Sequence, residues 1–129
     1  MPVVALALAN LAATHARRGE YAKSLDHLER SLALKEKGSN PLDVASTLGH
    51  IGVLRQALGD HERALGYCER ALAIQERLGQ RRAMAETLGN IGSILRSLGE
   101  RDRAIATLER ALAVQREIED RPGEADTLG

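Results

Sequence analysis

Phenylalanine and tryptophan are absent from the sequence, and tyrosine occurs only as Tyr21 and Tyr67. A hydrophobic core must therefore be built from Leu, Ile, Val and Ala, a set of residues that suits closely packed helices. The chain also offers few aromatic rings on which the bases of a nucleic acid would stack. These absences favour a helical domain and argue against binding of single-stranded nucleic acid.

An excess of charge of either sign is absent as well, because Lys plus Arg and Asp plus Glu each total 18. A neutral chain has no overall field that would attract nucleic acid phosphates or an anionic membrane. No segment approaches the roughly 18 unbroken apolar residues that a membrane-spanning helix needs. We therefore expect neither a nucleic acid nor a membrane as a partner.

Cysteine is nearly absent too, and the single Cys68 excludes an internal disulfide framework. One unpaired cysteine fits a reducing compartment, so we expect a cytoplasmic location. The apolar stretch that opens the chain resembles the core of a secretory signal, but it has no basic start and it aligns with later parts of the sequence. The chain of 129 residues has room for one domain of ordinary size.

The sequence does contain a strong internal repeat with a period of 40 residues. Shifting residues 48–87 by 40 positions onto residues 88–127 gives 17 identities in 40. Residues 8–47 are more divergent but keep Leu8, Gly19, Leu25 and Thr47 in register with the second copy. Such self-similarity is the sequence signature of a repeat architecture. We predict a single array with repeats at approximately 2–40, 41–80 and 81–120, and the start of a truncated fourth repeat at 121–129.

Each repeat has turn signals at fixed places that divide it into two helices. Gly19, Gly59 and Gly99 lie where a left-handed residue ends a helix, and an acidic residue suited to the start of the next helix follows each of them. Asn40 followed by Pro41 is a typical helix start. The sequence predicts an all-α fold of antiparallel helix-turn-helix repeats, with helices at approximately 3–17, 20–37, 42–57, 60–78, 82–97 and 100–118.

The helix predicted at 82–97 shows how its two faces differ. At about 100° per residue, Leu88, Ile91, Gly92, Leu95 and Leu98 lie on one side, while polar residues lie on the other. A glycine inside a helix costs about 1 kcal/mol relative to alanine. We therefore expect Gly92, and Gly52 in the preceding repeat, to allow close approach of a neighbouring helix.

The residues at these positions resemble the tetratricopeptide repeat, in which a large residue, Leu-Gly and Tyr on the first helix are followed by Ala, Phe and Ala on the second. The second repeat matches this pattern with Leu48, Ile51-Gly52, Arg55, Ala64, Cys68 and Ala71, and the third with Leu88, Ile91-Gly92, Leu95, Ala104, Leu108 and Ala111. The longer unit resembles the subclass found in kinesin light chains, spindle-orientation adaptors and bacterial regulators. The resemblance implies a right-handed superhelical solenoid that binds proteins.

Relatives of this subclass bind extended peptides in the concave groove that the first helices line. The resemblance implies that Asn10 and Asn90 match the asparagine that grips a peptide backbone, and that His50 takes the equivalent place in the middle repeat. An amide can donate to a carbonyl and accept from an N–H, so it can bind main chain of any sequence. The predicted groove further comprises Leu6, Ala13, Arg17, Ser46, Val53, Gln56, Ala57, Glu86, Ser93, Arg96 and Ser97, with Arg17 and Arg96 able to select an acidic side chain.

Several alternatives stay open at this point. The polar residues could form a solvated face only. The chain starts at a repeat boundary and stops at Gly129, so it could be a piece of a longer array that self-associates through its apolar ends. It could also serve as a structural assembly module. A third alternative is a sensor segment of a larger bacterial signalling protein. No two histidines have metal-ligand spacing, and Cys68 takes the place of a core residue. We therefore expect no metal, no cofactor and no enzymatic activity.

Overall fold

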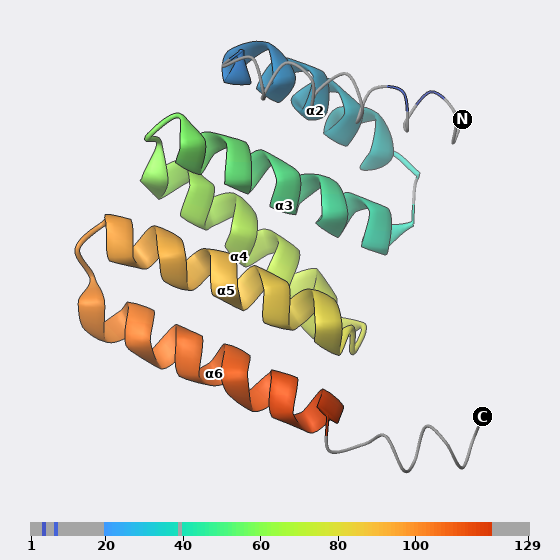
Figure 1. Cartoon of the computed structure of the whole chain (residues 1–129). Coiled ribbons are helices and arrows are strands. Elements are labelled where there is room, and N and C mark those ends of the chain that lie inside the picture. Colours follow the sequence, from blue (N-terminus) through green and yellow to red (C-terminus); the bar gives the residue numbers. More distant parts are fainter. Residues whose placement is uncertain (1–3, 5–6, 8–19, 39, 120–129) are drawn as a thin grey trace, which may run out of the picture.

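The computed structural model describes residues 4, 7, 20–38 and 40–119. This part of the chain is all-helical and contains no strand (Figure 1). The helices are α2 (Tyr21–Lys35), α3 (Pro41–Ala57), α4 (His61–Arg77), α5 (Arg81–Ser97) and α6 (Arg101–Glu119). They agree with five of the predicted helices to within two residues. The helix predicted at 3–17 lies almost entirely outside the described residues.

From α2 to α6, each helix packs against its neighbour in the sequence, as expected of a solenoid. The tightest pairs are α3 with α4 and α5 with α6, which are the two helices of one predicted repeat. Contacts between α2 and α3 and between α4 and α5 join neighbouring repeats, and α3 also touches α5 (Figure 1). The first helices of successive repeats are thus neighbours, which is the arrangement that a shared groove requires.

Glycines in the left-handed conformation end three of the helices. Gly59, Gly79 and Gly99 have φ values of 83°, 68° and 80°. In the turn at Gly59, the N–H of Gly59 donates to the carbonyl of Gln56, and the N–H of Asp60 donates to the carbonyl of Arg55. This pair of bonds is the Schellman arrangement, and it satisfies carbonyls that the end of the helix would otherwise leave open. Gly19 lies outside the described residues.

The helix starts differ from one another. The side chain of Asn40 accepts a hydrogen bond of 2.9 Å from the N–H of Leu42, which confirms the predicted cap. Glu20 and Asp60 also occupy cap positions, but their side chains make no capping hydrogen bond. Asp60 instead accepts a hydrogen bond from Arg55, so tertiary contacts decided the role of that carboxylate.

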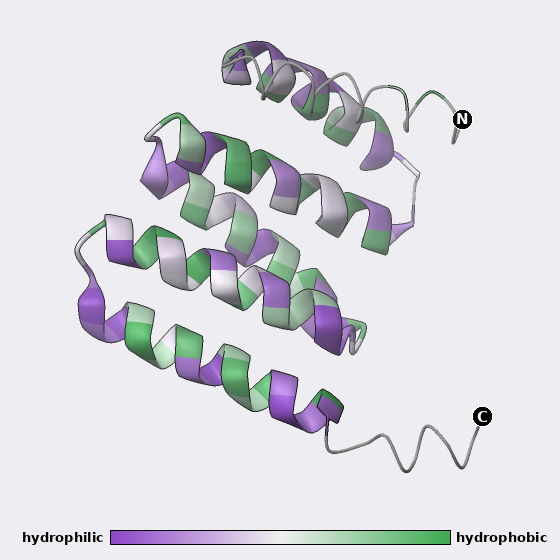
Figure 2. Cartoon of the chain, viewed as in Figure 1, coloured by the Kyte–Doolittle hydropathy of each residue, from purple (hydrophilic) through white to green (hydrophobic). Residues whose placement is uncertain are grey.

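The core consists of the aliphatic residues that the composition required, gathered in two clusters. One joins α2, α3 and α4 and includes Leu28, Leu48 and Ile51. The other joins α4, α5 and α6 and includes Cys68, Leu88 and Ile94. Polar and apolar residues are interspersed along the described helices (Figure 2). The separation into an apolar and a polar side is clear in α2, α4 and α5 and nearly absent in α3.

The two glycines inside helices do lie at close helix contacts. A Cβ added to Gly52 would stand 2.5 Å from Cys68 Sγ and 3.3 Å from the carbonyl oxygen of Ala64. A Cβ added to Gly92 would stand 2.6 Å from two carbons of the Leu108 side chain. Both distances are too short for a carbon contact, so in repeats two and three the second helix packs directly on the glycine of the first helix.

Candidate peptide-binding surface

The predicted groove residues of the described chain lie on α3 and α5. Ser46, His50, Val53 and Ala57 recur at intervals of three or four residues, which places them on one face of α3. Glu86, Asn90, Ser93 and Ser97 repeat the same spacing on α5. We refer to these two rows as the α3–α5 surface. Ser46, His50, Val53, Ala57, Glu86 and Ser97 are exposed, whereas Asn90 and Ser93 are partly buried.

One hydrogen bond joins α3 directly to the row on α5. The side-chain amide of Gln56 donates to the hydroxyl of Ser93 over 2.9 Å. Both residues are in the predicted groove, and the structure brings them together from repeats two and three although they are 37 positions apart in the sequence. This bond fixes the spacing of α3 and α5, and it also occupies two polar groups that would otherwise be open to a ligand.

Asn90 lies in the middle of the α5 row. Its side chain makes no hydrogen bond to any residue that the structure describes. A partly buried amide in this state keeps both its donor and its acceptor for a ligand. Asn10, Ala13, Arg17 and Leu6, the predicted contribution of the first repeat, lie outside the described residues.

One titratable group, His50, lies on the α3–α5 surface, and another, Arg96, lies beside it on α5. Desolvation by neighbouring groups, together with the positive charge of Lys35, lowers the pKa of His50 below its ordinary value. His50 is therefore neutral at pH 7 and can accept a hydrogen bond as well as donate one. Arg96 is exposed and forms no ion pair with another described residue, so it can meet a carboxylate.

Cys68 has the properties of a core residue. It is fully buried, and its Sγ faces Gly52. Burial, helped by the charge of Glu69, raises the pKa of the thiol to about 11. The thiolate that nucleophilic chemistry needs is therefore scarce at neutral pH. Within the described ranges, no group of three or more His, Cys, Asp or Glu side chains could hold a metal ion.

A polar cluster around Arg55 is a feature that the sequence did not predict. Its guanidinium donates to Glu29 over 3.0 Å and to Asp60 over 2.9 Å, and it lies 5.7 Å from the ring centre of Tyr67. Burial opposes the charge, but these two hydrogen bonds raise the pKa of Arg55 above its usual value. The cluster ties α2, α3 and α4 together across an open hollow. The one signal in the sequence was the arginine at a position where the repeat pattern has tyrosine.

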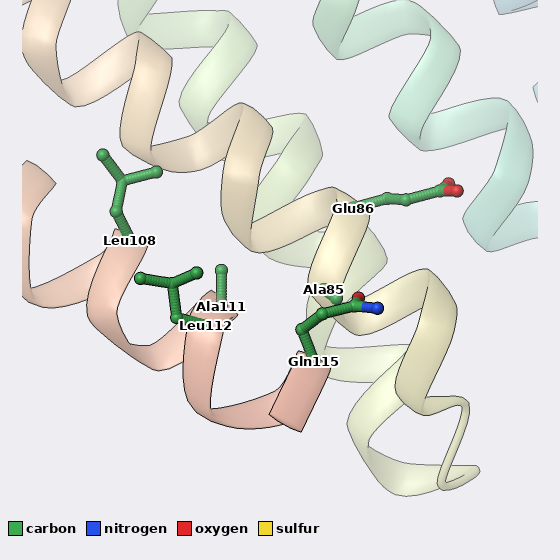
Figure 3. A pocket seen from close by; sticks show the side chains of 6 residues that line it. All are labelled: Ala85, Glu86, Leu108, Ala111, Leu112 and Gln115. Carbon is green, nitrogen blue, oxygen red and sulfur yellow. The ribbon is translucent and has the colours of Figure 1, made fainter. Parts of the chain in front are cut away.

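A second unpredicted feature is an apolar pocket between α5 and α6. It has a volume of about 440 Å³ and is lined by Ala85, Glu86, Leu108, Ala111, Leu112 and Gln115 (Figure 3). The leucines come from α6, and the side chain of Gln115 extends toward α5 (Figure 3). Glu86 joins this pocket to the α3–α5 surface.

None of the described helices is long and apolar enough to cross a membrane.

Comparison with protein families identifies the repeat. Residues 43–129 match a family model described as "Tetratricopeptide repeat", and residues 4–41 match a second model with the same description. A search of curated proteins gave no significant match.

Solved structures agree with the family models. The TPR domain of Arabidopsis FLU superimposes with a TM-score of 0.79 at 20% identity, covering 87% of this chain and 94% of that one. BtubC (BKLC) from P. vanneervenii gives a TM-score of 0.83 at 26% identity, and the match covers 90% of this chain but only 48% of BtubC. A kinesin light chain-like repeat protein from Podosopora anserina gives 0.52 at 15% identity, covering 86% and 74% of the two chains. The long-repeat resemblance seen in the sequence thus has structural counterparts.

Proposed function

The chain belongs to the tetratricopeptide repeat family, whose repeats are generally non-enzymatic protein-interaction scaffolds, and from this premise we propose that its α3–α5 surface binds an extended peptide segment of a partner protein. The binding residues in this proposal are Asn10, Ala13, Arg17, Ser46, His50, Val53, Gln56, Glu86, Asn90, Ser93, Arg96 and Ser97.

The observation that carries the proposal is the state of Asn90. Asn90 is partly buried as a residue, and its side-chain amide has no hydrogen-bond partner among the described residues. The amide is accessible to solvent, so it can donate to and accept from the main chain of a bound peptide without breaking a hydrogen bond within the protein. Exposed Arg96 on the same helix favours a peptide with an acidic residue.

Support also comes from the geometry between the repeats. The bond from Gln56 to Ser93 holds α3 and α5 at a fixed spacing. A surface that is organised before binding loses less conformational entropy when a ligand binds. Val53, which is 43% exposed, supplies an apolar contact between the polar groups.

The test is a peptide-display selection on the immobilised chain, repeated with the double variant Asn10→Ala plus Asn90→Ala. Glu69→Ala, an exposed change on α4, is the matched control. We expect the native chain and the control to enrich the same acidic peptides, and the double variant to lose them. Enrichment that survives in the double variant contradicts the proposal.

A second candidate function is assembly through the ends of the array, and the apolar pocket on α6 favours it. In this case groove substitutions leave the interactions intact, whereas Leu112→Glu removes them. Sedimentation of the native chain at high micromolar concentration tests the simplest form, which is self-association.

Three expectations from the sequence stay predictions. They are a role as the sensor segment of a larger bacterial signalling protein, a cytoplasmic location, and the division into repeats at 2–40, 41–80 and 81–120.

A further inference from the structure

The open hollow beside Arg55 lies between α2, α3 and α4 and has a volume of about 520 Å³. We call it the Arg55 hollow. Its described lining comprises Glu29, Arg55, Arg63, Gly66, Tyr67 and Arg70. Arginines outnumber carboxylates three to one among these residues, so the lining has an excess of positive charge.

Packing does not require an arginine at the place of Arg55. The equivalent residue of the next repeat is Leu95, which is 1% exposed in the core. The Arg55 side chain is also largely buried, at 13% exposure, and its Nε has no hydrogen-bond partner within the described chain. A buried charge loses its hydration, and aliphatic residues that replace buried ion pairs often leave stability unchanged or raise it. Stability alone therefore does not account for Arg55.

Gly66 is a second residue of the lining that stability does not explain. It lies inside α4, where glycine is less favourable than alanine. A Cβ at this position would meet nothing within 4 Å, in contrast to Gly52. The equivalent residues of the other repeats are Asp26 and Ala106, so this helix position accepts a side chain. Gly66 leaves the Arg55 hollow open, and residues that break a local rule without a packing reason are expected at functional sites.

Arg63 and Arg70 stand on either side of Gly66 along α4. They are seven residues apart, which places them on one face of the helix with a separation of about 10 Å along its axis. Arg63 lies 3.8 Å from Asp60, and Arg70 lies 2.9 Å from Glu36. Both arginines are more than half exposed, and exposed ion pairs contribute little to stability. A ligand with a higher negative charge can therefore take both arginines from their present partners.

We propose that the Arg55 hollow binds a phosphate monoester, carried by a phosphorylated side chain of a partner protein or by a small phosphorylated compound. A phosphate monoester has three terminal oxygens and close to two negative charges at neutral pH. Arg63 and Arg70 hold it from two sides through charge-assisted hydrogen bonds. Arg55 donates to Glu29 and Asp60 and so offsets the carboxylates that would repel an anion. A carboxylate ligand has only two oxygens and one charge to share between the two arginines of α4.

The next repeat supplies a matched control within the same chain. Arg103 and Arg110 are the equivalents of Arg63 and Arg70, and each of them also pairs with a carboxylate. In place of Arg55, Gly66 and Tyr67 this repeat has Leu95, Ala106 and Thr107. A phosphate that needs only exposed arginines would bind in both places, whereas one that needs the Arg55 hollow binds in the first alone.

The test is a titration of the ¹⁵N-labelled full chain, followed by the NMR signals of backbone amides and of arginine Nε–H groups. The probes, used up to millimolar concentration, are a capped Gly-phosphoserine-Gly peptide, glycerol phosphate, and a capped Gly-Glu-Gly peptide. We expect the phosphorylated probes to shift the signals of Arg63, Gly66, Tyr67 and Arg70. They should bind about tenfold more tightly than the glutamate peptide, because they offer more charge and more acceptors to the arginines. The tighter phosphorylated probe identifies the source of the phosphate, a protein side chain or a small compound.

Variants of the chain make the test specific. Arg63→Gln plus Arg70→Gln should weaken binding of the phosphorylated probes by about tenfold or more, because both charge-assisted contacts are lost. Arg103→Gln plus Arg110→Gln removes the same charge from the next repeat and should leave binding unchanged. Gly66→Leu fills the Arg55 hollow and should weaken binding while all three arginines of the lining remain. All of these positions are exposed, so the fold is retained, and the unliganded spectra verify this.

Three outcomes overturn the inference. Equal shifts at Arg103 and Arg110 show that phosphate meets exposed arginines of either repeat without the Arg55 hollow. Equal affinity for the glutamate peptide shows that the hollow does not select phosphate. Absence of shifts at millimolar phosphorylated probe excludes the site. The proposed groove is independent of all three, since Arg55 lies two residues from Val53 and therefore on the opposite face of α3.

Discussion

Gly49 and Gly52 lie three residues apart in the middle of α3, yet their surroundings are opposite. A Cβ at Gly49 would meet nothing within 4 Å, whereas a Cβ at Gly52 would collide with Cys68 Sγ and approach the backbone of Ala64. Neither residue has a positive φ. At the residue scale, therefore, one glycine is required by helix packing and the other is only a weak point of the helix.

Alanine substitutions at these two positions should change stability in opposite directions. Gly49→Ala should raise the free energy of unfolding by about 1 kcal/mol, because alanine loses less backbone entropy in a helix. Gly52→Ala should lower it by about 1–3 kcal/mol, because α3 and α4 would have to separate. Urea unfolding followed by circular dichroism measures both. Equal effects at the two sites would contradict the close contact at Gly52.

His50 should make stability depend on pH. Its pKa is lowered in the folded state, so the unfolded state takes up the proton first as the pH falls. The native chain should therefore lose stability below about pH 6.5, the ordinary histidine value, relative to His50→Gln. Above that pH the difference between the two should be constant. If the native chain instead becomes more stable relative to His50→Gln as the pH falls, the pKa of His50 is raised in the folded state.

At the scale of single elements, α3 and α5 start in different ways. The side chain of Asn40 caps α3, whereas that of Gln80, at the same position before α5, makes no capping bond. The two helices have the same length of 17 residues, so the strength of the start does not decide where the helix ends. The glycine turns and the packing of the apolar faces determine where each helix ends.

Removal of the two side chains should separate capping from packing. Asn40→Ala should lower the free energy of unfolding by about 1 kcal/mol, the usual value of an N-cap. Gln80→Ala should change it by less than about 0.5 kcal/mol, as for an ordinary surface position. Thermal or urea unfolding of the two variants side by side gives the comparison. If both variants lose the same free energy of unfolding, the hydrogen bond from the N–H of Leu42 to Asn40 does not add to stability.

On the scale of the whole molecule, stability depends on the interfaces between repeats, because each repeat buries its apolar face only against a neighbour. The buried bond between Thr87 and Gln75 lies in the interface of repeats two and three. It is polar and specific, and it fixes the register of α5 on α4. Aliphatic side chains on the same faces bury apolar area, but their contacts would tolerate a shift in the register of α5 on α4.

A double-mutant cycle should measure this coupling. Thr87→Val should cost about 1–3 kcal/mol, because the amide of Gln75 would stay buried without a partner. The double variant Thr87→Val plus Gln75→Leu should regain part of that loss, since both polar groups are then gone. Additive effects of the two substitutions, measured by urea unfolding, would mean that the two side chains do not interact.

Much of the architecture was predictable from the sequence because helix periodicity, left-handed glycines and the Asn-Pro start are local signals. The 40-residue period added the long-range information, since copies of one unit must stack in the same way. The periodicity therefore predicted the helix bounds, the all-α class and the close contacts at Gly52 and Gly92. The residues of the α3–α5 surface were instead implied by the resemblance to tetratricopeptide repeats. Whether that surface binds a peptide stays a prediction.

Only the tertiary structure decided which side chains meet across repeats. Arg55 with Glu29, Gln56 with Ser93 and Thr87 with Gln75 depend on rotamers and on helix spacing, which no pattern within one helix determines. The exposure of Leu108 and Leu112 was equally hidden, because in sequence they occupy the same positions as buried residues of earlier repeats. Position along the chain defines the face of a helix, but only its neighbours in space determine whether that face is covered.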